Sequence, residues 1–346
     1  MLAGMIRFSV RHAGVVLSLA MLLLVYGAYR LSHAGLDIFP EFSAPRVVIQ
    51  TETIGLTAEQ TETLVTHRIE RHLAGLIGLD TLRSESIQGL SVVTATFQDG
   101  TDIYRNRQLV GERLNALGSE LPAGIGAPVI VPLSSSSATV LTIGLRSDQR
   151  SLMDLRDLVD WMLTPRLLAV PGVADVNVFG GEIRQLQIQP DAERLRRHGL
   201  SIQEILTAAE QATGMPGAGF IENANQRIAL NVTGMPTTAE ALRQVVLIRK
   251  QGQQVRLGDV ANVTSGSRPS IGAAAIGGKP AIVIMVIGQY GANTLSVSRA
   301  VESILGDFET LFQRQAIDFY PHLFRPADYI ERSLQNLSGH LLIGGL

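Results

Sequence analysis

The sequence contains no cysteine among its 346 residues. Disulfide frameworks, thiolate metal sites and cysteine nucleophiles are therefore excluded. The absence is compatible with an oxidising compartment, because a chain without thiols cannot form wrong disulfides there. The length corresponds to a little over two domains of average size.

Charge is scarce as well. Charged residues make up 17% of the chain and apolar residues 46%, whereas average proteins have about 25% charged residues. This amount of apolar surface argues against a disordered chain. The 29 basic and 31 acidic residues give a formal net charge of −2. We expect no nucleic-acid partner, because electrostatic binding to nucleic acid requires a clear basic excess.

One long apolar stretch lies near the N-terminus. Residues 13–31 are apolar apart from Ser18, the tyrosines and Arg30. About 19 helical residues extend about 28 Å, close to the roughly 30 Å of a bilayer's hydrocarbon core. We predict a cytoplasmic N-terminus over residues 1–12 and an uncleaved transmembrane helix over residues 13–32. The expected anchor residues are Val15, Leu19, Leu23, Tyr26 and Leu31.

A buried core helix and a cleaved signal peptide are the alternatives for this stretch. The run Val15–Leu24 has no polar face, which disfavours a core helix. No small-x-small cleavage pattern follows the stretch, which disfavours a signal peptide. Arg7 and Arg11 precede the stretch, while Asp37 and Glu41 follow it. The positive-inside rule therefore places the following residues across the membrane.

A second apolar run lies at the other end of the sequence. Residues 341–346 read Leu-Leu-Ile-Gly-Gly-Leu, and no charge or turn closes them. Such a run exposed to water favours aggregation. We expect residues 334–346 to be the start of a truncated second transmembrane helix, and the chain to be a fragment.

Between the apolar runs, short strands and helices alternate. Thr57 and Gln60 have the spacing of a capping box, which opens a helix. The order of elements begins a ferredoxin-like, split βαβ unit. The expected elements are a strand over 46–53, a helix over 57–76, strands over 81–86 and 90–98, and a helix over 102–118.

A second unit repeats this plan. An offset of 94 residues (172 − 78 = 94) places Gly78 on Gly172 and Leu82 on Val176. We predict an internal structural repeat, and the alternative is an accidental match of two amphipathic helices. The expected elements are a strand over 138–146, a helix over 151–169, and strands over 173–179 and 183–189 paired across Gly180-Gly181.

The second unit is interrupted by another compact block. Ser201 and Glu204 form a capping box that opens a short helix within this block. A glycine-rich turn follows, and a strand over 227–232 comes next. An insertion into a β-α-β-β-α-β unit explains this order. The elements expected after the insertion are strands over 271–276 and 281–287, a helix over 293–312 and a strand over 316–320.

Several segments then occur in a specific order. Gly35–Phe42, which reads Gly-Leu-Asp-Ile-Phe-Pro-Glu-Phe, directly follows the first apolar stretch. Together the segments resemble the first periplasmic half of a resistance-nodulation-division (RND) efflux pump. The Leu-Asp-Ile-Phe-Pro-Glu run resembles the heavy-metal branch, although Ile54-Gly55 replaces a frequent Pro-Gly. The other segments are Glu59–Glu70, Ser84–Ser91, Phe97–Asp102, Leu167–Val173, Gly217–Asn223, Leu257–Ala261 and Ala292–Leu295.

The resemblance implies an α+β fold with a transmembrane helix, in the bacterial inner membrane, with residues after about 33 in the periplasm. It implies a homotrimer in the lipid bilayer, a periplasmic membrane-fusion adaptor and an outer-membrane channel. The implied subdomains are a first porter subdomain over 38–130, a second over 135–180 and 272–330, and an inserted docking subdomain over 181–271. The candidate residues of an intersubunit arm are Met215, Gly217, Gly219, Phe220 and Glu222.

Candidate metal ligands do not form a convincing set. His67 and His72 are five residues apart, which turns them by about 140° on a helix, whereas paired helical ligands need i, i+4 spacing. Met215 and Met235 carry thioethers suited to Cu(I), but a predicted strand separates them, and methionine commonly fills core gaps. We predict no metal site and no cofactor.

Catalytic motifs are also absent from the sequence. Ser134–Ser137 lacks a Gly-x-Ser-x-Gly elbow, so we predict a flexible linker between the porter subdomains. Gly277–Pro280 lacks the phosphate-loop pattern and predicts a hairpin turn. We predict no catalytic residue.

Three functions are compatible with these features. The first is the N-terminal fragment of a proton-driven permease, exporting heavy-metal cations or small compounds by alternating access and not competent alone. The second is a membrane-anchored periplasmic scaffold or adaptor without transport activity. The third is an anchored periplasmic enzyme. The family's proton-relay and metal-path residues lie in later segments, so none is assigned here.

Overall fold

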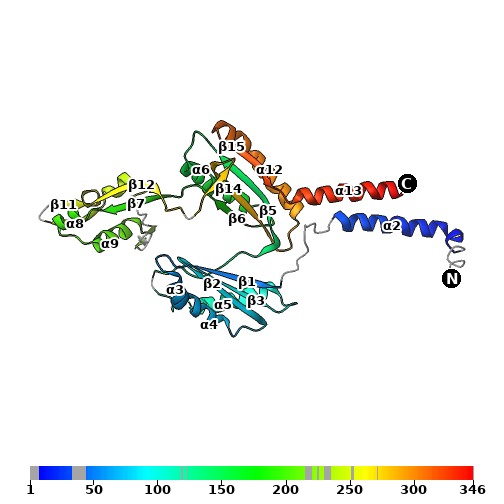
Figure 1. The fold of residues 1–346 in the computed structure, drawn as a ribbon, viewed down its shortest axis with the longest axis horizontal. Coiled ribbons are helices and arrows are strands. Elements are labelled where there is room, and N and C mark those ends of the chain that lie inside the picture. Colours follow the sequence, from blue (N-terminus) through cyan, green and yellow to red (C-terminus); the bar gives the residue numbers. More distant parts are fainter. Residues whose placement is uncertain are drawn as a thin grey trace.

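The computed structural model describes residues 8–32, 44–117, 120–122, 124–214, 220–223, 226–229, 235–250, 253–270 and 272–345. These residues form three α+β units and two helices that extend in the same direction away from them (Figure 1). The helices are α2 (Ala13–Ser32) and α13 (Ala327–Gly345). The motif segment Gly35–Phe42 lies outside the described residues.

The first unit is an antiparallel sheet with its helices on one face (Figure 1). Its strand order, β2-β3-β1-β4, is the ferredoxin-like order of a split βαβ unit. The strands predicted for this unit are present. Its elements are β1 (Arg46–Glu52), α3 (Ala58–Thr61), the π-helical turn η1 (Glu62–Thr66), α4 (His67–Leu73), β2 (Leu79–Ile87), β3 (Leu90–Phe97), α5 (Ile103–Leu117) and β4 (Val129–Ile130).

Alternation along the central strands of the first unit decides which sheet face meets the helices. Every second side chain of β3 is buried, and Val93 and Phe97 are at most 1% exposed. Each large apolar side chain buried in this way contributes about 1.5–3 kcal/mol. The core is completed by residues from β1 and the helices: Val47, Ile49, Val65, Ile69, Leu73, Val110 and Leu114.

The first helix of this unit is not uniform. The predicted capping box at Thr57 is present, but the helix changes to a π turn at η1 and ends at Leu73. Thr66, in the π turn, is buried, and its Oγ1 lies 2.8 Å from Ser86 Oγ and 2.7 Å from Ser91 Oγ. Burying a hydroxyl requires such partners. The hydroxyl cluster therefore ties the helix to β2 and β3.

The second unit has a closely related sheet. Its strand order is β13-β14-β5-β15, with β6 also paired to β14, so β6-β14-β5-β15 matches β2-β3-β1-β4. Its elements are β5 (Ser134–Arg146), α6 (Leu152–Leu158), the π turn η2 (Val159–Leu163), α7 (Thr164–Leu168), β6 (Val173–Phe179), β13 (Ala274–Ile276), β14 (Lys279–Gln289), α12 (Thr294–Arg314) and β15 (Asp318–Phe324).

The predicted internal repeat is supported by more than strand order. The helix caps Thr57 and Ser151 are 94 residues apart (151 − 57 = 94), and so are the positive-φ glycines Gly78 and Gly172. Both units also carry a π turn in their first helix. The two units are therefore built on one plan.

The hairpin predicted across Gly180-Gly181 is wrong. β6 pairs with β14, whereas the next strand, β7 (Arg184–Pro190), pairs with β12 in the insert. The centre of the sheet needs a strand with buried apolar side chains. β14 supplies Ile282, Ile284 and Val286, all 0% exposed, whereas β7 has no buried side chain.

Two turn predictions have opposite outcomes. The linker predicted at Ser134–Ser137 is wrong, because β5 begins at Ser134, and that residue pairs with Gln289 of β14. The hairpin predicted at Gly277–Pro280 is confirmed. Ile276 pairs with Lys279, and the two glycines between them have φ values of 59° and 76°, as two-residue hairpin loops require.

The third unit, which we call the insert, spans residues 184–267 and joins the second unit at both its ends. It lies at the opposite end of the molecule from α2 and α13 (Figure 1). Its core includes Leu257, Val260 and Val263, each 0% exposed. Its elements are β7, α8 (Ala192–His198), α9 (Ile202–Thr213), β8 (Phe220–Asn223), β9 (Gln226–Ala229), α10 (Ala239–Arg243), β10 (Val246–Lys250), β11 (Gln253–Arg256), α11 (Leu257–Val260) and β12 (Ala261–Ser267).

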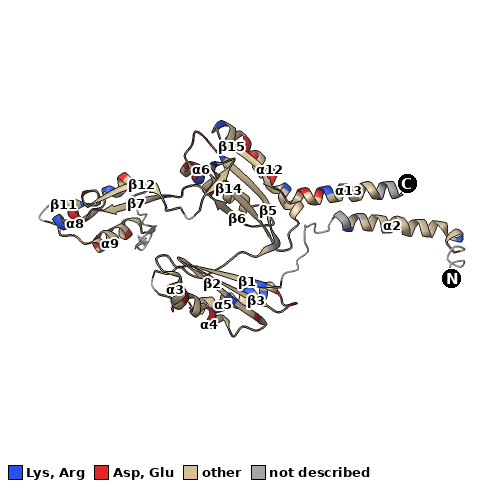
Figure 2. Cartoon of the chain, in the orientation of Figure 1, with Lys and Arg blue, Asp and Glu red and all other residues tan. Residues whose placement is uncertain are grey.

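The two outer helices differ in composition. α2 is uncharged over most of its length, whereas charges lie in the first two turns of α13 and on all three units (Figure 2). Within the described residues, no helix is long and apolar enough to cross a membrane. The helix predicted over 13–32 is present, and its spanning role remains a prediction.

Two buried threonines provide a matched test of the hydroxyl cluster. Thr66→Val removes the partner of Ser86 and Ser91, so we expect a loss of about 1–3 kcal/mol in local stability. Thr51 is 1% exposed, and its Oγ1 has no hydrogen-bond partner among the described residues. Thr51→Val should therefore be neutral or slightly stabilising. Hydrogen exchange of the β3 amides measures both effects, and equal losses would contradict this assignment.

Candidate functional site

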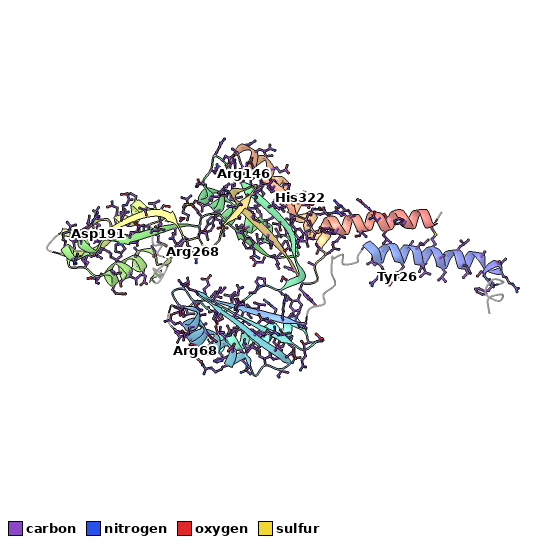
Figure 3. The ribbon with its side chains drawn as sticks, viewed as in Figure 1. Tyr26, Arg68, Arg146, Asp191, Arg268 and His322 are labelled. Carbon is purple, nitrogen blue, oxygen red and sulfur yellow. The ribbon has the colours of Figure 1, made fainter. Side chains whose placement is uncertain are left out.

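Two chain segments join the second unit to the insert, at Gly180–Ile183 and at Arg268. Gly180 and Gly181 have φ values of 75° and 78°, a region that side chains other than glycine rarely adopt. A Cβ on Gly180 would lie 2.5 Å from the carbonyl oxygen of Ala281. The amide of Arg268, which Figure 3 labels, donates to Ile183 O at 2.8 Å, so the two segments are held together where they leave the sheet.

Two arginines brace this joint. Arg156 Nη1 donates to Gly180 O at 2.8 Å, and its Nε lies 2.8 Å from Asp160 Oδ2. Arg184 bridges from β7 to Asp154 at 2.7 Å and to Asp157 at 2.6 Å. The Ser151 hydroxyl and then Arg184 lower the pKa of Asp154. The insert is therefore attached through two short chain segments, with a charged brace on the α6 side.

A second joint lies where β15 passes into α13. Arg325 sits between these elements with 10% of its side chain exposed, and it bonds Glu302 of α12 through Nε. It also contacts Asp328 at 2.5 Å and Glu331 at 3.0 Å. Arg299 adds a 2.9 Å contact to Glu331. The cluster links α12, the end of β15 and the start of α13.

The charges of this cluster stabilise one another. Hydrogen bonds from Arg325 and Arg299 lower the pKa of Glu331, and bonds to Glu302, Glu331 and Asp328 raise the pKa of Arg325. His322, which Figure 3 labels, lies 3.4 Å from Glu302. The motifs considered in the sequence did not predict this cluster of charged side chains. The available signal was an arginine followed by acids three and six residues later.

The candidate metal ligands are not brought together. His67 lies 3.7 Å from Glu62, and His72 lies 3.1 Å from Glu120. Among the described residues, no group of three or more His, Cys, Asp or Glu side chains is arranged to hold a metal ion. Met235 is 39% exposed, and Met215 lies outside the described residues.

The predicted arm is only partly described. Met215, Gly217 and Gly219 lie outside the described residues. Phe220 and Glu222 lie on β8, which pairs with β9 as a hairpin with Phe220 opposite Ala229. The strand predicted over 227–232 is described as β9, at Gln226–Ala229. The role of this hairpin in an assembly remains a prediction.

Comparison with known proteins identifies the family. A family model described as the AcrB/AcrD/AcrF family matches residues 5–346. The chain belongs to this family. A solved structure titled "X-ray crystal structure of a heavy metal efflux pump, crystal form II" matches 95% of the chain and 33% of its own length, with a TM-score of 0.84 and 25% identity.

Relatives among characterised proteins point to one branch. Protein HelA of Legionella pneumophila is 31% identical over 100% of this chain and 33% of its own length. The cation efflux system protein CusA of Escherichia coli K12 is 31% identical over 99% of this chain and 33% of its own length. The cation efflux system protein CzcA of Alcaligenes sp. strain CT14 is 30% identical over 87% of this chain and 29% of its own length. The predicted RND resemblance, on the heavy-metal branch, is confirmed, and the chain spans about a third of these relatives.

The joint at Gly180 gives a glycine pair for testing. Gly277→Ala adds a side chain at a positive φ with nothing within 4 Å, so we expect a loss of about 1 kcal/mol. Gly180→Ala adds the overlap with the Ala281 carbonyl, so we expect about 3 kcal/mol or more. Thermal unfolding followed by the single tryptophan, Trp161, compares the two. Equal losses would show that the close approach is unimportant.

The Arg325 cluster predicts a pH dependence. A lowered pKa means that Glu331 stabilises the fold above its ordinary value of 4.5, and that this contribution is lost as pH falls through the folded-state pKa. Glu331→Gln should therefore be less stable than the unmodified chain at pH 7, with a gap that narrows below about pH 4.5. The exposed Glu309→Gln on α12 should show no gap at either pH. A constant gap for Glu331→Gln would contradict the ion-pair assignment.

Proposed function

We propose that the chain is the N-terminal third of an inner-membrane RND permease, which exports heavy-metal cations or small compounds from the periplasm. The observation that carries this proposal is the pair of units built on one plan within a chain of this family. The relatives named as cation efflux proteins support a cation as substrate. Fold likeness to a heavy-metal efflux pump over 95% of the chain adds to this support.

The two units are suited to rigid-body movement. Each has its own closed core, with side chains such as Ile69 and Leu141 at 0% exposure. A connector at Val131–Leu133 leads from β4 into β5. Close-packed bodies joined by short connectors move by hinge or shear rather than by continuous deformation. We propose that such movement provides alternating access, with 38–130 as the first porter subdomain and 135–180 plus 272–330 as the second.

The membrane anchor is part of this proposal. The large apolar side chains of α2 whose burial is described are exposed, and those of Leu17, Met21 and Leu24 are at least 69% exposed. Such a surface is unfavourable in water and favourable in lipid. We propose that α2 inserts into the inner membrane after a cytoplasmic segment, and that residues 334–346 begin a second span. α13 leaves the units in the same direction as α2 (Figure 1).

Assembly and energy coupling are proposed by family membership. A homotrimer with a periplasmic adaptor and an outer-membrane channel is the family's working form, with residues 181–271 as the docking subdomain. α2 contains no acidic residue, and proton relays in membranes depend on ionisable side chains. We propose that the proton drive resides in the part of the relatives that this chain does not span, so that the chain alone does not export.

A chimera tests the proposed function. Residues 1–346 would replace the matching first third of Escherichia coli CusA, in a strain that lacks its own copy. We expect the chimera to restore growth on at least one of a panel of metal cations, while residues 1–346 alone do not. A chimera that inserts and assembles normally but protects against no cation would contradict the proposal and favour an anchored scaffold without transport activity.

The anchor has its own prediction. Each arginine at the centre of a membrane helix costs about 2.5–3.5 kcal/mol of insertion free energy. The double variant Leu19→Arg with Leu23→Arg should therefore move the chain out of the carbonate-resistant membrane fraction. Ile54→Arg with Ile77→Arg, at positions 68% and 83% exposed in the first unit, should not. Retention of the first variant in that fraction would contradict the anchor.

A further inference from the structure

A cavity of about 360 Å³ opens where the first unit meets the start of the second. This volume lies in the range of small-molecule sites. β1 contributes Arg46 and Val48, and α5 contributes Tyr104 and Arg107. Tyr290, which follows β14 of the second unit, closes the other side. Its amide donates to Leu133 O of the connector at 3.4 Å, so the cavity is bounded by both units.

Several polar side chains of this cavity have hydrogen-bond donors without a protein partner among the described residues. Arg107 donates through Nη1 to Val131 O at 2.7 Å, and its other N–H groups have no partner among the described residues. Arg46 and the hydroxyls of Tyr104 and Tyr290 make no hydrogen bond or ion pair with the described part of the chain. Basic positions on β1 and α5 are visible in Figure 2. The cavity therefore presents donors that a ligand can satisfy.

The charge of the cavity favours an anion. Two guanidinium groups face one carboxylate, Asp102, whose Oδ1 already accepts the Tyr104 amide at 2.8 Å. Arg107 forms no ion pair with the described residues, and burial lowers the pKa of its guanidinium group. Guanidinium groups bind carboxylates with paired hydrogen bonds and repel cations. A free metal cation is therefore a poor ligand for this cavity.

We propose that this cavity is a binding site for a small amphipathic organic anion. Its carboxylate would lie between Arg46 and Arg107, and its apolar body would lie against Val48, Leu133 and the tyrosine rings. Aromatic rings and apolar walls with a few convergent polar groups are typical of small-molecule sites. The ligand contacts both units, and this site goes beyond the cation export proposed above.

Three probes of one shape test the charge requirement. Calorimetric titration of the full chain in detergent would compare 2-naphthoate, neutral 2-naphthol and the cation of 2-naphthylmethylamine, each against a detergent-only titration. We expect naphthoate to bind at least tenfold more tightly than naphthol, and the cation to bind most weakly. Equal affinities of naphthoate and naphthol, or no binding of naphthoate, would overturn the proposal.

Arginine variants test the location. Arg46→Gln removes a side chain without hydrogen bonds to the described residues, so the fold should be kept while naphthoate affinity falls at least tenfold. Arg107→Gln should have the same effect, with circular dichroism reporting whether loss of the Val131 contact disturbs the fold. Arg113→Gln, on the exposed side of α5, should leave affinity unchanged. An equal loss in Arg113→Gln, or no loss in Arg46→Gln, would overturn the proposed site.

Discussion

The pairing of β14 with both β5 and β6 is the constraint on which the second half of this chain depends. β14 lies opposite β5 from Ile282 to Gln289 and opposite β6 from Val283 to Gly288. Its inward side chains form the centre of the core with those of β5. Because β14 comes about a hundred residues after β6, the intervening chain must leave the sheet and return. Loop-closure entropy grows only slowly with loop length, so this insertion is tolerable once the strand pairs are formed.

Local signals in the sequence were sufficient for much of the fold. The helix caps at Thr57 and Ser201 were predictable, because a cap depends on residues within one turn. The partner of β6 was not predictable from spacing, because β7 is nearer in sequence and has strand character. Only the comparison of burial along β7 and β14 decides between them. The serine run was misjudged for a similar reason, since pairing with β14 makes Ser134 part of a strand despite its polar sequence.

The candidate joints were even less visible from sequence. Arg325 is bound by acids on two helices and lies 23 residues from Glu302 along the chain, so no local motif marks it. Gly180 was identified as a turn, but its close approach to Ala281 comes from a strand a hundred residues later. Both joints lie at edges of the second unit. This unit is therefore connected to the insert on one side and to α13 on the other, through narrow segments held by arginines.

This arrangement gives the proposed transport cycle a physical basis. The first and second units share one strand order, and each has its own hydrophobic core. They are joined by a short connector, and each core is too tightly packed to deform smoothly. Movement is then concentrated at the connector, at the segments leading to the insert and at the Arg325 cluster.

The most direct test of this account is hydrogen exchange on a chain that lacks residues 182–280, in which Gly180-Gly181 leads directly to Ala281. If the second unit is a complete copy of the plan, amides of β5, β6 and β14 should keep their protection. Loss of protection along β14 would show that the sheet depends on the removed residues, which comprise the insert and β13, and would contradict the account.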